Sequence, residues 1–97
     1  MYAAIRIYQY KAGAYDEISK SVESGFVGII SKAPGFIAYY LVNTGGDTLA
    51  TVSVFESQAG AEESTRMAAD WVKANLAALV TAPPEVKAGA VTVHKTK

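Results

Sequence analysis

The stretch Phe36–Ser57 constrains the fold most, because it contains two β-rich apolar runs around a single turn. Val, Thr, Tyr, Ile and Phe dominate both runs, and Asn43–Thr48 between them contains two adjacent glycines. Paired glycines supply the positive φ angles that a tight hairpin turn requires. The sequence therefore predicts an antiparallel β-hairpin over this stretch.

The length of the turn decides which side chains share a face of the sheet. A turn of even length centred on Gly45-Gly46 places Tyr40 opposite Thr51. A loop of odd length shifts the pairing by one residue, so that one strand turns its side chains to the opposite faces. The sequence leaves open whether Tyr39 or Tyr40 lines an interior cavity.

Length and composition predict a single globular domain spanning residues 1–97. Apolar residues make up 51% of the chain and charged residues 19%, and halves of this length would bury too little surface to fold. Nine basic and nine acidic side chains cancel and no basic run occurs, so nucleic acid is not an expected partner. The absence of cysteine excludes disulfides, thiolate metal sites and thiol nucleophiles.

No targeting or membrane-spanning segment is predicted. The N-terminal MYAAIRIYQYK lacks the basic region and the long apolar run of a signal peptide, and no uncharged apolar stretch reaches about 18 residues. A membrane is therefore not an expected partner, and the predicted location is cytoplasmic.

Hydrophobic periodicity predicts the element order β-α-β-β-α-β. The elements other than the hairpin are a strand at Tyr2–Tyr10, a helix from about Tyr15 to Ser31, a helix from Gln58 to Leu79 or Val80, and a strand from about Val86 to Lys95. This order is typical of the α+β, ferredoxin-like fold, in which two helices cover one face of a four-stranded antiparallel sheet.

Three residues predict local features of the helices. Ser57 is expected to cap the second helix, because a serine hydroxyl accepts a hydrogen bond from a free backbone N–H there. Gly25 and Gly28 lie in the first helix, where glycine is a poor helix former. They either allow close packing on the sheet or make the second half of that helix irregular.

The sheet face without helices is predicted to be apolar and aromatic in the even-length register. Its expected members are Ala4, Arg6, Tyr8, Phe36, Ala38, Tyr40, Leu49, Thr51, Ser53, Phe55, Ala90, Thr92 and His94. An exposed patch of this kind usually marks an interface or a ligand site. A second copy of the chain would cover it in a symmetric homodimer, the commonest assembly.

Several segments together resemble one family. They are the opening strand YAAIRIYQY, Pro34-Gly35-Phe36 leading into a strand, the run Val52–Glu56, and the helix ending AADWVKANLAAL. The pattern is similar to the antibiotic biosynthesis monooxygenase-like family of the dimeric α+β barrel group. The resemblance implies that two sheets pair into a barrel and that each subunit keeps a pocket between its sheet and helices. Some members oxidise phenolic or anthrone-like compounds with molecular oxygen and neither metal nor flavin; others degrade haem, are stress-responsive, or have no assigned activity.

The candidate site combines a cation, hydroxyl groups and aromatic rings. Arg6 in mid-strand lies either on a wet face or in a cavity, where it stabilises a phenolate or enolate. His94 or Tyr40 is the candidate proton acceptor or relay. The candidate substrate-binding residues are Tyr8, Phe36, Thr51, Ser53, Phe55 and Trp71. The alternative is that the aromatic rings belong to the core and that Trp71 lies at the subunit contact.

No cofactor or metal is expected. Haem degradation in the similar family needs a histidine on the second helix and an asparagine early in the first strand, whereas this helix has no histidine and the strand carries Arg6. No cluster of His and carboxylate residues with metal-ligand spacing occurs.

Two functions remain open from the sequence. The first is a cofactor-independent monooxygenase, an oxidoreductase acting on a small phenolic or quinol-like compound. The second is a non-catalytic dimeric module that binds a small hydrophobic ligand, with a stress-related or other role. The resemblance supports both, because a shared fold does not imply a shared function.

Overall fold

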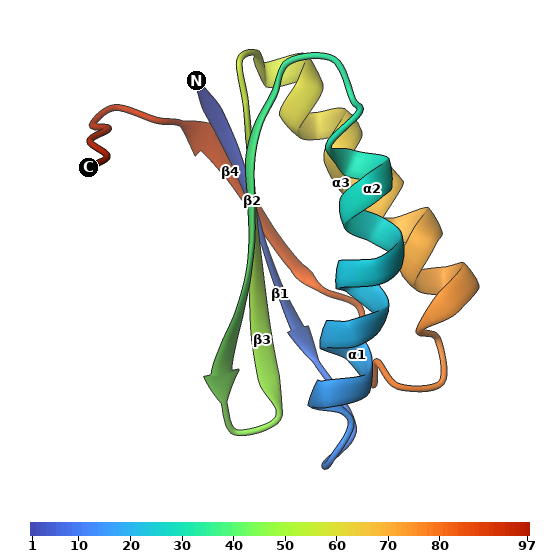
Figure 1. Cartoon of the computed structure of the whole chain (residues 1–97). Coiled ribbons are helices and arrows are strands. Elements are labelled where there is room, and N and C mark those ends of the chain that lie inside the picture. Colours follow the sequence, from blue (N-terminus) through green and yellow to red (C-terminus); the bar gives the residue numbers. More distant parts are fainter.

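A computed structural model describes residues Met1–Lys97 and contains one four-stranded sheet with helices packed on one of its faces (Figure 1). The elements are β1 (Tyr2–Gln9), α1 (Tyr15–Ser21), η1 (Val22–Phe26), α2 (Val27–Ile30), β2 (Phe36–Gly45), β3 (Thr48–Phe55), α3 (Gln58–Asn75) and β4 (Glu85–Ala90). The strand order is β2-β3-β1-β4 and all neighbours are antiparallel. The consecutive segments α1, η1 and α2 are called the first helical layer, and α3 is the second helix. Both lie on the same side of the sheet (Figure 1). The predicted α+β, ferredoxin-like fold is confirmed.

The hairpin turn lies one residue further along the chain than the sequence predicts. Gly46 and Asp47 both have positive φ angles, of 63° and 61°, and Gly45 pairs with Thr48 across them. Two consecutive positive φ angles characterise the type I′ turn, whose twist suits a two-residue hairpin. Register shifts near each end of β2 then place Tyr39 opposite Ser53. The predicted even register, centred on Gly45-Gly46, is therefore wrong over the middle of the strand.

The two faces of the sheet are the reverse of those predicted for β1 and β3. Arg6 and Tyr8 of β1, and Thr51 and Ser53 of β3, are buried beneath the helices, although the sequence pattern predicts them on the open face. The outer face instead carries aliphatic residues such as Ile7. The prediction is wrong because it leaves the face that mixes aromatic rings with Arg6 and hydroxyl groups outside, whereas these polar side chains find hydrogen-bond partners in one another and on α3.

The first helical layer keeps its buried residues in line by widening in the middle. Ile18, Val22, Phe26 and Ile30 are all buried and recur every four residues. In an α-helix each such interval drifts by about 40° around the axis. Val22–Phe26 forms a π-helix, whose wider turn reverses the drift. Of the two alternatives stated for Gly25 and Gly28, an irregular helix is therefore observed around Gly25, whereas Val27–Ile30 is regular.

The second helix begins as predicted and ends earlier. The Ser57 hydroxyl accepts a hydrogen bond from the Gly60 N–H at 3.1 Å, which confirms the cap. The helix ends at Asn75, before the predicted Leu79, because the chain turns back towards β1. There Lys11 N–H donates to the Leu79 carbonyl at 2.9 Å. This bond joins the segment that follows α3 to the segment that follows β1.

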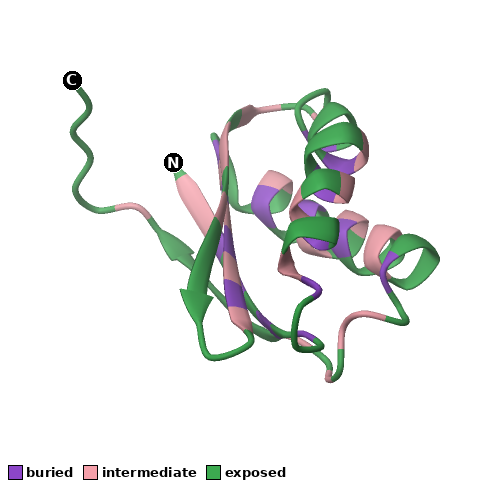
Figure 2. Ribbon diagram, turned by 60° about the horizontal axis from the view of Figure 1, so that its bottom comes forward, coloured by how far each residue is buried: buried purple, intermediate pink, exposed green.

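The last strand is shorter than predicted and ends at Ala90. Beyond Val91 the chain leaves the sheet as an exposed tail (Figures 1 and 2). His94 therefore lies outside the sheet, in contrast to the strand predicted to reach Lys95. No helix of the structure has the length and apolar character needed to cross a membrane. The cytoplasmic location and the single-domain organisation stay predictions.

Substitution of Gly60 tests the packing of α3 on the sheet. A β-carbon at Gly60 would lie 2.9 Å from Cδ2 of Phe55, so we expect Gly60→Ala to lower the free energy of unfolding by about 1–3 kcal/mol. Gly28→Ala is the control, since a β-carbon there meets nothing within 4 Å and the better helix former should add up to about 1 kcal/mol. Urea unfolding at one protein concentration measures both. Equal stabilisation by the two variants would contradict the predicted contact.

Candidate functional site

Arg6 is the centre of a buried cluster of hydroxyl groups between the sheet and α3. Its side chain is only 1% exposed. Nε donates to Thr51 Oγ1 at 3.1 Å and the second terminal nitrogen donates to Ser53, both on β3. The other terminal nitrogen donates to Ser64 Oγ at 3.4 Å and to Thr65 Oγ1 at 3.1 Å, both on α3. The guanidinium thus joins three elements through neutral partners.

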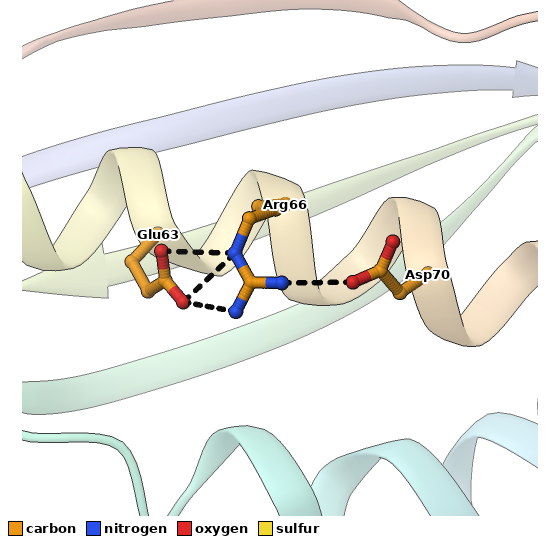
Figure 3. A network of polar contacts seen from close by, with 3 residues as sticks. All are labelled: Glu63, Arg66 and Asp70. Atoms are coloured by element: carbon orange, nitrogen blue, oxygen red, sulfur yellow. Dashed lines mark hydrogen bonds and ion pairs between the residues drawn. The ribbon is translucent and has the colours of Figure 1, made fainter.

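No carboxylate accompanies the Arg6 cation. The ion pairs of the structure are those of Arg66 with Glu63 and with Asp70, and that of Lys87 with Glu85. Arg66 shows the contrast, because its guanidinium lies on the surface of α3 between two carboxylates (Figure 3). Burial of an unpaired charge is unfavourable, so Arg6 retains a strong preference for a negative charge nearby.

The tyrosines near Arg6 are held in their neutral form. Burial raises the pKa of Tyr39 to about 12, and the neighbouring Arg6 cation opposes part of that rise. Burial also raises the pKa of Tyr8, again against the effect of Arg6. Burial lowers the pKa of Arg6 itself, although a guanidinium stays protonated in proteins. Neither phenol therefore supplies the missing negative charge at neutral pH.

A narrow apolar cavity adjoins this cluster. Of its 13 lining residues 12 are hydrophobic, and the hydroxyl of Thr51 is shared with the Arg6 cluster. The volume not filled by atoms is about 390 Å³, a figure that includes space open to solvent. The volume that the centre of a water molecule can occupy is only about 30 Å³. The lining residues are Tyr8, Ile18, Val22, Phe26, Tyr39, Leu41, Leu49, Thr51, Ala68, Trp71, Val72, Leu76 and Val80. The cavity is too narrow for an aromatic ring without movement of its wall.

Three aromatic rings form one wall of the cavity. The ring of Phe26 lies 5.5 Å from Trp71 and 5.6 Å from Tyr39, measured between centroids. Gly25 in η1 allows the close approach of Trp71, since a β-carbon there would lie 3.0 Å from its Cζ2. These rings come from η1, α3 and β2, so the wall depends on the packing of both helical layers on the sheet.

The structure brings together some of the residues predicted for the site. Tyr8, Thr51 and Trp71 line the cavity, while Arg6 and Ser53 lie in the adjoining hydroxyl cluster. These five positions stay proposals for ligand binding.

The other four predicted residues lie away from the cavity. Phe36 and Phe55 pack edge to face at 5.8 Å outside the cavity lining. Tyr40 is 56% exposed on the outer face, so of the two neighbouring tyrosines Tyr39 is the one that lines the cavity. His94 lies in the exposed tail. Within one chain, Tyr40 and His94 therefore do not contact the candidate site.

Sequence reasoning did not assign Ser64 or Thr65 to the site. Both lie on α3 and accept hydrogen bonds from Arg6. A signal was present, because Ala61, Ser64 and Ala68 follow helical i, i+3, i+7 spacing and are all buried. A serine in a stripe of buried alanines indicates a buried polar partner.

The fold has many solved relatives, although no protein-family model and no curated protein matches this sequence. A Nitrosomonas europaea protein assigned to the antibiotic biosynthesis monooxygenases superposes with a TM-score of 0.75 at 13% identity, over 96% of this chain and 100% of that one. The chain has the antibiotic biosynthesis monooxygenase-like fold. The resemblance inferred from the sequence is confirmed at the level of the fold.

Two further structures share the antibiotic biosynthesis monooxygenase-like fold. The monooxygenase ActVA-Orf6 of Streptomyces coelicolor, in complex with nanaomycin D, has a TM-score of 0.76 at 16% identity, over 99% of this chain and 91% of that one. The haem-degrading MhuD of Mycobacterium tuberculosis, with two haems in its active site, has a TM-score of 0.76 at 18% identity, over 99% and 100%. At these identities the likeness shows the fold alone.

The residues of this chain do not fit haem. The cavity lining contains neither histidine nor cysteine, the commonest axial ligands, and His94 lies in the tail. Tyr8 and Tyr39 have raised pKa values, which disfavours the phenolate needed to bind iron. These side chains therefore favour an organic anion over haem iron.

The buried phenol of Tyr39 should make stability depend on pH in alkaline solution. Because its folded-state pKa is raised from 10.0 to about 12, the stabilisation present below pH 10 is lost as the pH rises through about 12. We expect Tyr39→Phe to flatten the fall in unfolding free energy across this window. Tyr40→Phe on the outer face is the control and should leave the fall in place. Identical pH profiles for both variants would contradict the assignment of Tyr39 to the interior.

Proposed function

We propose that this protein is a cofactor-independent monooxygenase acting on a small phenolic or quinol-like compound. The observation that carries the proposal is the buried Arg6 guanidinium, which has no carboxylate partner and adjoins an apolar cavity. Such a site favours a planar ligand that becomes anionic on an oxygen atom. The shared fold with the monooxygenase ActVA-Orf6 supports the same class of reaction.

Thr51 connects the cation to the cavity. Its Oγ1 accepts the hydrogen bond from Arg6 Nε, and the same residue lines the cavity. The hydroxyl proton of Thr51 is then available to donate to an oxygen atom of a bound ligand. A donor polarised by a cation in a dry site stabilises a developing oxyanion strongly. Arg6 and Thr51 would therefore lower the pKa of a bound phenol.

The proton of the substrate has no side-chain base to receive it in the cavity. Tyr8 and Tyr39 are neutral phenols with raised pKa values, and the candidate relays Tyr40 and His94 lie elsewhere. Ionisation would then depend on the acidity of the substrate itself, with loss of the proton to water. We therefore place His94 and Tyr40 outside the catalytic machinery of a single chain.

The reaction balances without an external reductant. In an anthrone-like substrate the ring CH₂ carbon loses both hydrogens and becomes a carbonyl, while molecular oxygen supplies that carbonyl oxygen. The second oxygen atom leaves as water with the two hydrogens. The substrate gives four electrons and molecular oxygen accepts four. The stabilised enolate is the species that transfers electrons to oxygen, which is the step that Arg6 would promote.

Oxygen uptake with anthrone tests the proposal. We expect the wild-type chain to convert anthrone to anthraquinone and Thr51→Val, which removes the hydroxyl but keeps the shape, to lower kcat/KM by about 10–100-fold. Arg6→Met should abolish turnover, whereas Arg66→Met removes an exposed guanidinium on α3 and should have no effect. Thermal unfolding of each variant verifies the fold. Turnover that is unchanged in Thr51→Val and Arg6→Met would refute the roles given to these residues.

A non-catalytic binding module is the second candidate. The observation that favours it is the lining of the cavity, in which 12 of 13 residues are hydrophobic and no general base occurs. In this case the protein would hold a small hydrophobic ligand without changing it. Binding of anthrone with no oxygen uptake would support this function over the first.

We also propose that two copies pair through the outer face of the sheet, as the dimeric α+β barrel architecture predicts. This face exposes large apolar side chains on β1 and β2, and the helices leave it uncovered (Figure 1). Its exposed members include Ile5, Ile7, Tyr40 and Val42. A contiguous apolar face of this kind favours a symmetric contact with a second copy.

A charge on the outer face should disrupt the dimer. We expect Ile7→Lys to convert the dimer to monomer in sedimentation velocity. In a symmetric dimer each copy would bury one additional lysine charge in the same interface, which is unfavourable. Ile29→Lys is the matched control, since Ile29 is similarly exposed but lies on α2. A wild-type monomer, or a dimer that both variants preserve, would contradict pairing through this face.

A further inference from the structure

A second space lies on the surface directly beside the cavity. It is an open groove between the first helical layer and β2, of which the centre of a water molecule can reach about 190 Å³. The groove is lined by Ser19, Val22, Glu23, Val27, Tyr39 and Leu41. Its outer part carries a hydroxyl and a carboxylate, whereas the cavity is almost wholly apolar. The two spaces therefore differ in polarity.

Val22, Tyr39 and Leu41 line both spaces, so they form the wall between them. Val22 comes from η1, and the other two residues come from β2. No helix-to-strand backbone bond crosses this wall, because β2 pairs only with β3. A π-helix has a wider, less favourable turn than an α-helix and often marks a functional position. The wall is therefore made of side chains alone.

We propose that the groove is the outer half of one ligand site and that Val22 controls passage into the cavity. The ligand class is a planar aromatic alcohol whose hydroxyl points to Thr51 and whose distal end lies in the groove beside Ser19 and Glu23. The cavity alone is too narrow for a ring, since about 30 Å³ holds little more than a water molecule, whereas the joined spaces can hold one. This inference rests on the proposed function only in that a ligand occupies the cavity.

Trp71 provides a direct readout of ligand entering the cavity. It is the single tryptophan of the chain and lines the cavity but not the groove. A naphthalene ring beside it should quench its fluorescence. Stopped-flow mixing with 2-naphthol therefore measures association with the inner half of the site, and needs no turnover.

Two substitutions of Val22, with Ile29→Ala as control and Leu41→Ala as a second wall variant, test the role of Val22. Val22→Ala opens the wall and should raise the association rate constant for 2-naphthol roughly tenfold, while Val22→Phe fills it and should lower that constant roughly tenfold, each equal to about 1.4 kcal/mol of barrier. Ile29→Ala, on the same helical layer but outside both spaces, should associate like the wild type. Leu41→Ala removes the opposite side of the wall and should also accelerate association, which keeps the test valid if Val22→Phe fails to fold.

The result that overturns the inference is equally specific. Val72 lines the cavity from α3 and does not touch the groove. If Val72→Ala accelerates association as much as Val22→Ala, or if no wall variant changes it, ligand does not pass through the groove. Absence of oxygen uptake with intact 2-naphthol binding would remove the monooxygenase proposal and leave this inference standing. Oxygen uptake that the wall variants do not change would support the monooxygenase proposal and refute passage of the ligand through the groove.

Discussion

The packing of α3 on the sheet depends on the hydrogen bonds of one buried cation. Arg6 is held by hydroxyls from β3 within the sheet and by hydroxyls from α3, and the bonds to Ser64 and Thr65 require α3 to lie in place on the sheet. A guanidinium has donors in a fixed planar fork, so its partners must lie at set directions. The same contacts therefore fix the orientation of the helix and keep a positive charge next to the cavity. Arg6 therefore contributes both to the packing of α3 on the sheet and to the candidate chemistry.

The polar interior explains why the two faces of the sheet look misleading in the sequence. A residue alternation identifies two faces but does not say which one the helices cover. Here the covered face holds Arg6 and its hydroxyl partners, whereas the aliphatic face is left for a proposed second copy. Where both faces of a sheet are apolar enough to pack against another element, hydrophobicity alone does not identify the face that the helices cover. The hydrogen-bond partners available to buried polar groups identify that face instead.

The element order and the likeness to the antibiotic biosynthesis monooxygenase-like fold were predictable, because helical spacing, Pro-Gly breaks and the hairpin are local signals. The position of the turn was not, since Gly45-Gly46 and Gly46-Asp47 are both able to adopt positive φ angles. Tyr8, Thr51 and Trp71 line one cavity, and Thr51 contacts Arg6, so these members of the predicted set stay together although the sequence assigned β1 and β3 to the wrong faces. The cavity residues of η1 were not identified as such, because the wall depends on packing between distant segments.

The π-helix lets the first helical layer hold one residue more between Ile18 and Ile30 than a regular α-helix would. A π-turn is equivalent to one additional residue in an α-helix. Without it, the buried positions of the first helical layer would follow the ordinary spacing of four, three and four residues. The π-turn in the wall of the cavity thus accommodates one residue more than α-helical spacing needs, with Ile18 and Ile30 still buried at either side. One additional residue can therefore change the shape of the cavity wall while both ends of the helix keep their places.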